Sequence, residues 1–307
     1  MSFGRAIILK TAAFKPVERL VRRSFLFRGV VRRFIAGDTL AEAMISAEEV
    51  AKRGLKVSLD FLGESTTKRD EAEQACAMYR QIVEAIAASP HRDAINISIK
   101  LTQCGLDIDP SWAEDNYRQV LWQAAESNTF VRVDMEATDY TERTITMIER
   151  VFADFKNTGT VLQSYLKRSM DDTRRMVKLG ARVRVVKGAY LEPESLTVGD
   201  KGATDRQYIE MAKILMAEGN YPAIATHDEK IILALKSWAK ENGIEKERFE
   251  WQMLYGIRRD LQDSLHEEGY NVRVYIPFGD SWYPYFTRRL AERPANMWFI
   301  LKAMFRK

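Results

Sequence analysis

The stretch A-I-N-I-S-I-K (94–100), followed one helix-length later by F-V-R-V-D-M-E (130–136), decides the fold class. In both stretches apolar residues alternate with polar ones, which is the pattern of a β-strand with one apolar face. Between them, Trp112–Ser127 has the apolar spacing of a helix. A strand, a helix and a second strand form a right-handed unit with parallel strands. We therefore expect an α/β protein.

The same unit recurs along the chain. We expect eight strands, at Lys56–Leu62, Ala94–Ile99, Phe130–Met135, Thr160–Leu166, Arg182–Lys187, Pro222–Thr226, Phe249–Met253 and Asn271–Ile276. The expected helices are Thr67–Ala88, Trp112–Ser127, Tyr140–Lys156, Ser169–Leu179, Asp205–Glu218, Glu229–Asn242, Ile257–Glu268 and Ser281–Phe305. Eight units in about 250 residues favour a (β/α)8 TIM barrel, and an open doubly wound sheet is the alternative.

Polar residues on the strands are expected inside the barrel, because the outer face of each strand must pack on helices. The charged residues of this parity are Asp60, Lys100, Arg132, Asp134, Arg182, Arg184, Glu250 and Arg273. We expect Arg132, Arg182 and Arg273 to belong to a buried ion lattice in the lower barrel. Barrel enzymes place their chemistry at the carboxyl ends of the strands. That rim offers Lys100, Asp134, Gln163, Arg184, Thr226, His227 and Tyr275.

Composition and missing motifs exclude several classes of protein. The chain has 307 residues, 46% hydrophobic and 29% charged, and no stretch of about 18 residues is free of charge, so we expect no membrane-spanning helix. Two cysteines and three histidines argue against a disulfide framework or a metal site and favour the cytoplasm. The net charge of +4 argues against a nucleic-acid partner. No G-x-G-x-x-G, P-loop or G-x-S-x-G motif occurs.

The amino-terminal part of the chain has a charge pattern of its own. The first 33 residues hold nine basic residues against one acid, Glu18, interleaved with apolar residues at helical spacing. Such a basic amphipathic segment either packs on the main domain with its arginines in water or contacts an anionic membrane surface. We divide the chain into an N-terminal helical arm, residues 1–54, and a barrel domain, residues 55–307.

One face of the last helix carries a further candidate site. Tyr285, Arg288, Arg289 and Glu292 follow the spacing i, i+3, i+4, i+7, which places them on one side of a helix above the barrel mouth. Two guanidinium groups there can hold a carboxylate bidentately, with Glu292 orienting one of them. A solvated surface pair is the alternative. The positive charge of the rim favours an anionic ligand over a glycosidase with paired acids.

Five motifs, in order, resemble the flavin-dependent proline dehydrogenase family. They are R-V-V-K-G-A-Y (184–190), A-T-H-D (225–228), F-E-W-Q-M-L-Y-G-I-R-R-D-L-Q (249–262), V-R-V-Y-I-P-F-G (272–279) and W-Y-P-Y-F-T-R-R-L-A-E-R-P-A-N (282–296). The resemblance runs from about Lys56 to the C-terminus and is to the monofunctional bacterial type. It implies a distorted (β/α)8 barrel that oxidises L-proline to pyrroline-5-carboxylate by hydride transfer to FAD. This reaction is the first step of proline catabolism to glutamate.

The resemblance also implies roles for single residues. A first group would surround the substrate: Lys100, Tyr275, Tyr285, Arg288, Arg289 and Glu292. A second group would bind non-covalent FAD: Met135, Gln163, Arg184, Lys187, Gly188, Ala189, Thr226 and His227. Asp134 and Arg184 would be catalytic, with Asp134 anchoring either Lys100 or the arginine network. A loop over residues 191–206 would cover the adenylate end of FAD.

The same resemblance implies an electron acceptor and a place in the cell. Electrons would pass to a membrane quinone, and the basic arm would allow peripheral contact with the inner face of the membrane. Because no function is carried over to the arm, we expect its removal to leave proline turnover intact.

Overall fold

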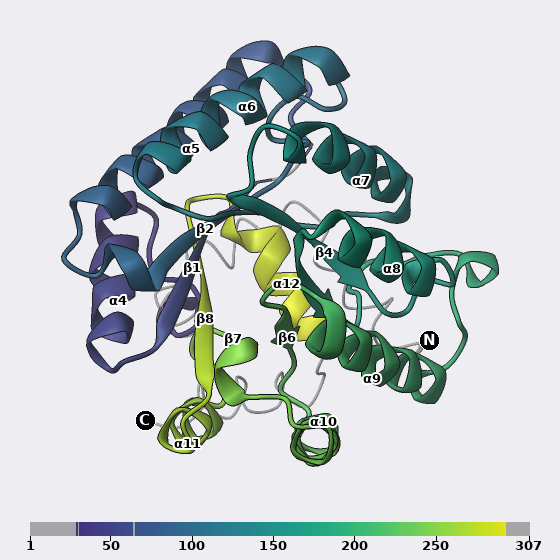
Figure 1. Cartoon of the computed structure of the whole chain (residues 1–307). Coiled ribbons are helices and arrows are strands. Elements are labelled where there is room, and N and C mark those ends of the chain that lie inside the picture. Colours follow the sequence, from purple (N-terminus) through teal and green to yellow (C-terminus); the bar gives the residue numbers. More distant parts are fainter. Residues whose placement is uncertain (1–28, 30, 64, 293–307) are drawn as a thin grey trace.

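Eight parallel strands form a closed barrel in the order in which they occur in the chain. The computed structural model describes residue 29, residues 31–63 and residues 65–292, the last five of these (288–292) by their backbone only. Figure 1 shows the helices as an outer ring, with α12 across the centre of the strands. The predicted TIM barrel is confirmed, and the open sheet is excluded because β1 pairs with β8.

The eight strands agree in number and order with those expected, and the described helices are the eight expected ones preceded by α4. The strands are β1 (Lys56–Phe61), β2 (Ile95–Ile99), β3 (Val131–Val133), β4 (Thr158–Gln163), β5 (Arg182–Val186), β6 (Ala223–Ala225), β7 (Glu250–Leu254) and β8 (Asn271–Phe278). The described helices are α4 (Leu40–Lys52), α5 (Arg69–Ala88), α6 (Pro110–Glu126), α7 (Thr138–Phe152), α8 (Ser169–Leu179), α9 (Lys201–Glu218), α10 (Glu229–Glu241), α11 (Arg259–Glu267) and α12 (Trp282–Glu292). The expected continuation of the last helix, 293–305, lies outside the described residues.

One expected loop is partly wrong. Residues 201–206 form the first turns of α9 rather than the end of a loop over 191–206. The reason is a helix cap, since the Asp200 side chain accepts a hydrogen bond of 2.7 Å from the Ala203 N–H. Only residues 191–200, which include the short 3₁₀ turn η2 (Glu194–Leu196), are available as a loop.

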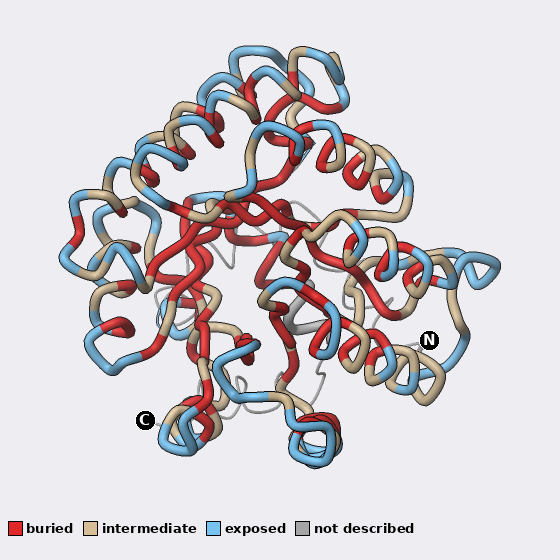
Figure 2. Tube along the Cα trace, in the orientation of Figure 1, coloured by how far each residue is buried: buried red, intermediate tan, exposed pale blue. Residues whose placement is uncertain are grey.

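The apolar core lies between the strands and the surrounding helices. Figure 2 shows buried residues along the strands and on the inner sides of the helices. Helix α4 belongs to the same core through Ala43, Ala47 and Val50, so the end of the arm packs on the barrel. The boundary at residue 54 stays a prediction, and residues 1–28 lie outside the described part. None of the described helices has the length and apolar character needed to cross a membrane.

Within the described part of the chain, the lower barrel contains one ion pair where a lattice was expected. Arg273 Nε lies 2.7 Å from Glu250 Oε1, and Arg132 donates to the carbonyls of Thr160 and Arg182 at 3.0 and 2.8 Å. Arg182 lies over the Phe130 ring, 5.0 Å from its centroid. The lattice is therefore wrong for Arg132 and Arg182 among the described residues. Arg273 binds Glu250 Oε1, whereas Arg132 contacts carbonyl oxygens and Arg182 contacts an aromatic ring.

Candidate active site

A cavity of about 1440 Å³ opens at the carboxyl ends of the strands. Residues of β1, β4, β5, β6, β7 and β8 line it, together with residues that follow β2 and β3, and α12 contributes Tyr285 and Phe286. Ligand pockets usually measure about 300–1,000 Å³, so this one has room for a large ligand and a small one together. It is lined by every candidate residue whose side chain is described: Lys100, Asp134, Met135, Gln163, Arg184, Lys187, Gly188, Ala189, Thr226, His227, Tyr275 and Tyr285.

The remaining candidates, Arg288, Arg289 and Glu292, belong to α12, but their side chains lie outside what the structure describes. The helix itself is placed as expected, because it crosses the barrel mouth.

Asp134 is the centre of the polar cluster on the cavity floor. Its Oδ1 accepts from Arg184 Nη1 at 3.0 Å, and its Oδ2 accepts from the Tyr275 hydroxyl at 2.5 Å. Lys100 Nζ lies 3.9 Å from the same Oδ2. Asp134 therefore contacts both Lys100 and Arg184, and its expected contact with Lys100 is present.

Asp60 completes this cluster and was given no role from sequence. Lys100 Nζ lies 2.6 Å from Asp60 Oδ1, and both side chains are buried. Burial raises the pKa of Asp60, although the charge of Lys100 opposes the shift. The sequence pattern could have identified Asp60. Its side chain has inward parity near the carboxyl end of β1, and Lys100 follows the carboxyl end of β2 in the same way.

Arg184 is held from two sides. Its Nη2 donates to Ser98 Oγ at 2.8 Å, and its guanidinium lies over the Tyr275 ring, 5.0 Å from the centroid. Burial raises the pKa of Tyr275 well above its usual value, so its hydroxyl stays a donor to Asp134. Arg184 Nε is buried and makes no hydrogen bond within the described protein. The guanidinium is thus fixed, and its Nε is a buried donor without a partner among the described residues.

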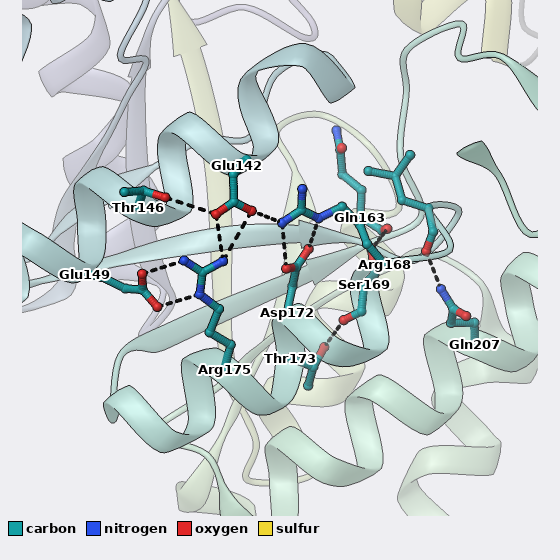
Figure 3. A network of polar contacts seen from close by, with 11 residues as sticks. Glu142, Thr146, Glu149, Gln163, Arg168, Ser169, Asp172, Thr173, Arg175 and Gln207 are labelled. Carbon is teal, nitrogen blue, oxygen red and sulfur yellow. Dashed lines mark hydrogen bonds and ion pairs between the residues drawn. The ribbon is translucent and has the colours of Figure 1, made fainter. Parts of the chain in front are cut away.

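Gln163 at the end of β4 is fixed by a network on the outside of the barrel. Its backbone carbonyl accepts from Ser169 Oγ at 2.5 Å, and its Nε2 donates to the Glu136 carbonyl at 3.2 Å. Figure 3 shows how the start of α8 is tied to α7, with Arg168 between Glu142 and Asp172. The Gln163 Oε1 atom is buried and has no partner among the described residues.

The segment after β5 approaches its neighbour closely at Gly188. This residue has φ +109°, and a Cβ there would lie 2.2 Å from the Tyr165 ring. Tyr165 N–H also donates to the Lys187 carbonyl at 3.0 Å. Only glycine fits this position, because a side chain would collide with the ring and strain the backbone.

Lys187 has carboxylate partners that sequence reasoning missed. Its Nζ lies 2.6 Å from Asp205 Oδ1 and 3.1 Å from Asp228 Oδ2. Burial opposes ionisation of both acids, but hydrogen bonds from Lys187 outweigh it and lower their pKa values. Asp228 stood in the A-T-H-D motif and could have been identified from it. No motif in the sequence pointed to Asp205, because an acidic residue at the expected start of a helix is ordinary.

The ends of β6 and β7 are joined through His227. Its Nε2 accepts from the Leu254 N–H at 3.0 Å, which fixes the orientation of the imidazole. Thr226 Oγ1 accepts from the Asp228 N–H at 3.0 Å. On β7, Gln252 Oε1 is a buried acceptor with no partner in the described structure.

These residues suit an organic cofactor better than a metal ion. Within the described ranges no group of three or more His, Cys, Asp or Glu residues could hold a metal. The cavity instead contains one donor and two acceptors that are buried without partners, Arg184 Nε, Gln163 Oε1 and Gln252 Oε1. A planar ring system with both donor and acceptor edges would satisfy such a set.

Comparison with known proteins shows the family of this chain. The family model for proline dehydrogenase matches residues 43–302. This chain belongs to the proline dehydrogenase family. Proline dehydrogenase 1 of Bacillus subtilis (strain 168) is 40% identical over 276 residues, covering 90% of this chain and 91% of that protein. Proline dehydrogenase of Deinococcus radiodurans is 37% identical and covers 98% of each.

A solved structure of similar fold comes from a larger protein. It is proline utilization A (PutA) of Bdellovibrio bacteriovorus inactivated by N-propargylglycine, with a TM-score of 0.80 and 26% identity. The match covers 89% of this chain but 34% of PutA, whereas the Bacillus and Deinococcus proteins match over nearly their whole length. The resemblance to the monofunctional type is confirmed. The family consists of oxidoreductases that carry out the first step of proline catabolism.

Proposed function

We propose that this chain oxidises L-proline to pyrroline-5-carboxylate with non-covalently bound FAD as the hydride acceptor. The observation that carries the proposal is the single cavity that joins the Asp134 cluster to the Gly188 segment on one side and to α12 on the other. Its volume of about 1440 Å³ leaves space for a dinucleotide and a five-membered ring. Membership of the family supports proline as the substrate.

FAD supplies the redox chemistry, and the chain supplies its binding and orientation. Met135, Gln163 and Arg184 would contact the ring system, where the partnerless polar atoms lie. Lys187, Gly188 and Ala189 would contact the ribityl and phosphate part. Thr226 and His227 would complete the site. Among the described residues no cysteine lines the cavity, and the one histidine in that lining, His227, uses Nε2 to accept from Leu254, which supports non-covalent binding.

The substrate would bind between α12 and the floor of the cavity. Lys100, Arg288 and Arg289 would hold the proline carboxylate, and Glu292 would orient the two arginines. Tyr275 and Tyr285, which both line the cavity, would enclose the ring. Holding the substrate in this way keeps its reacting carbon near the cofactor, which converts binding into rate.

Asp134 and Arg184 would act during the chemical step. Arg184 is a fixed cation that would stabilise the negative charge that FAD gains when it accepts the hydride. Asp134 holds Arg184 and Tyr275 in place through hydrogen bonds of 3.0 and 2.5 Å. Since both cavity-floor carboxylates already accept bonds from cationic groups, we propose that the proline amine releases its proton to water.

The electron acceptor would be a membrane quinone, reached by a cytoplasmic protein whose basic arm contacts the inner face of the membrane. The nine basic residues of the first 33 support this contact. Sedimentation with anionic vesicles should carry the protein down, and vesicles of neutral lipid should not. Equal sedimentation with both would contradict an electrostatic contact.

Anaerobic titration with L-proline tests the central proposal. The purified holoenzyme should show the FAD absorption bands, and these should bleach as proline is added. Acid precipitation should release all of the flavin into the supernatant. Protein without flavin, or flavin that L-proline does not bleach, would overturn the proposal, and flavin left in the pellet would overturn non-covalent binding.

A further inference from the structure

The segment Val31–Gly37, which we call the strap, packs on α12 at the mouth of the barrel. Val31 and Ile35 are buried together with four aromatic residues of the first turns of α12, namely Trp282, Tyr283, Tyr285 and Phe286. This cluster is separate from the main core of the barrel. Among the described residues, its members outside α12 are Val31, Phe34 and Ile35 of the strap and Leu62.

The strap is attached to the barrel on both sides of this contact. The Ala36 N–H donates to the Pro277 carbonyl at 2.9 Å, and the Gly279 N–H donates to the Gly37 carbonyl at 3.0 Å. These bonds join the strap to the end of β8 and to the turn that leads into α12. At the other side, a Cβ on Gly256 would lie 1.8 Å from the Arg33 carbonyl oxygen, so the strap rests on the loop after β7.

The strap also reaches the cavity. Phe34 lines it, as do Tyr285 and Phe286 of α12 and Asp60 and Leu62 on the β1 side. The residues proposed to contact FAD belong to other parts of the cavity wall, on β4 and β5 and after β3, β5 and β6. A displacement of the strap would therefore move α12 more than it would move the residues proposed to contact FAD.

We propose that the strap is a positioning element of the substrate site, which sets the distance between α12 and the Asp134 cluster. This inference rests on the proposed function, because it assigns substrate binding to α12. It replaces the expectation that the arm can be removed without loss of proline turnover. The strap belongs to that arm by sequence, yet its apolar side chains pack on the helix that carries the proposed carboxylate clamp.

Ile35→Ala in the holoenzyme tests the inference, with Ile86→Ala as the matched control. Both residues are buried isoleucines, but Ile86 lies on α5 in the main core. Ile35→Ala should raise the KM for L-proline about tenfold, since small displacements of binding groups have large effects, and should leave flavin content and the flavin dissociation constant unchanged. Ile86→Ala should lower the Tm without changing the KM.

Pyrrolidine, which lacks the carboxylate, separates the clamp from general damage. Its kcat/KM should fall less than that of proline in Ile35→Ala. The milder Ile35→Val is measured in parallel and should show the same pattern to a smaller extent. Equal KM values for proline in the parent, Ile35→Ala and Ile35→Val would overturn the inference. If the parent flavin does not bleach with proline, the proposed function fails instead.

Discussion

The barrel interior holds two layers of polar residues that look alike in sequence and differ in their surroundings. In the lower layer Glu250 is bound by Arg273, and Arg132 is bound by two backbone carbonyls. In the upper layer Asp134 is bound by Arg184 and Tyr275, and the same three residues line the cavity. An ion pair alone therefore does not identify a functional residue.

The two layers are related by a step of two residues along the same strands. Asp134 follows Arg132 on the path of β3, Arg184 follows Arg182 on β5, and Tyr275 follows Arg273 on β8. Each inward residue lies one layer above the previous one because the side-chain period of a strand is two. Distance from the carboxyl end thus distinguishes structural from candidate catalytic residues, and this comparison can be tested one strand at a time.

The largest effect is expected for Arg184→Ala. Loss of a fixed cation from a buried site should slow anaerobic flavin reduction by about a hundredfold or more, with a smaller change in proline affinity. Stopped-flow absorbance measures the rate. The control is Arg182→Ala on the same strand, which should leave the reduction rate unchanged. A normal reduction rate with a raised KM would make Arg184 a binding residue.

Glu250→Gln should affect stability and leave catalysis intact. Burial opposes ionisation of Glu250, but the charge of Arg273 and its hydrogen bond outweigh burial and lower the pKa of Glu250 to about 2. Its stabilising contribution is therefore complete above about pH 4.5 and is lost as the pH falls toward about 2. Breaking such a buried pair should lower the free energy of unfolding at pH 7 by about 3 kcal/mol.

Denaturant unfolding of the parent and of Glu250→Gln, measured between about pH 3 and about pH 7, checks this expectation. The difference in pH dependence should correspond to the uptake of roughly one proton. The variant should lack this part of the acid dependence while its KM for proline stays that of the parent. A raised KM at unchanged stability would place Glu250 in the site and contradict the division into two layers.

A smaller effect is expected for Arg288→Lys and Arg289→Lys. Lysine keeps the charge but loses the planar fork, so each variant should lose about tenfold in kcat/KM for proline. Pyrrolidine should be a poor substrate for the parent and nearly indifferent to either substitution, because it never makes the contact that is removed. Equal losses for proline and pyrrolidine in steady-state assays would show that the arginines hold the helix rather than the substrate.

Local pattern was enough to predict the barrel and most of the upper layer. Alternation with period two identified the strands, and inward parity brought Lys100, Asp134, Arg184 and Tyr275 together. Partners chosen by three-dimensional proximity could not be found in this way. Arg132 donates to backbone carbonyls, and every residue has one, so the residue types in the sequence do not indicate these partners. The strap contacts Gly256 through a backbone oxygen, and no spacing rule relates residues so far apart in the chain.

The seam between β1 and β8 has a consequence for synthesis of the protein. Arg273 donates to the Val57 carbonyl across a separation of 216 residues, so the seam closes only after nearly the whole chain has left the ribosome. Until then β1 and β7 are open sheet edges, which are prone to pair with other chains. The part of the cavity proposed for the substrate, with Tyr275 and Tyr285, is made after the part proposed for the cofactor. A nascent chain that has reached β7 can thus carry most of the residues proposed for the cofactor while it has no place for proline.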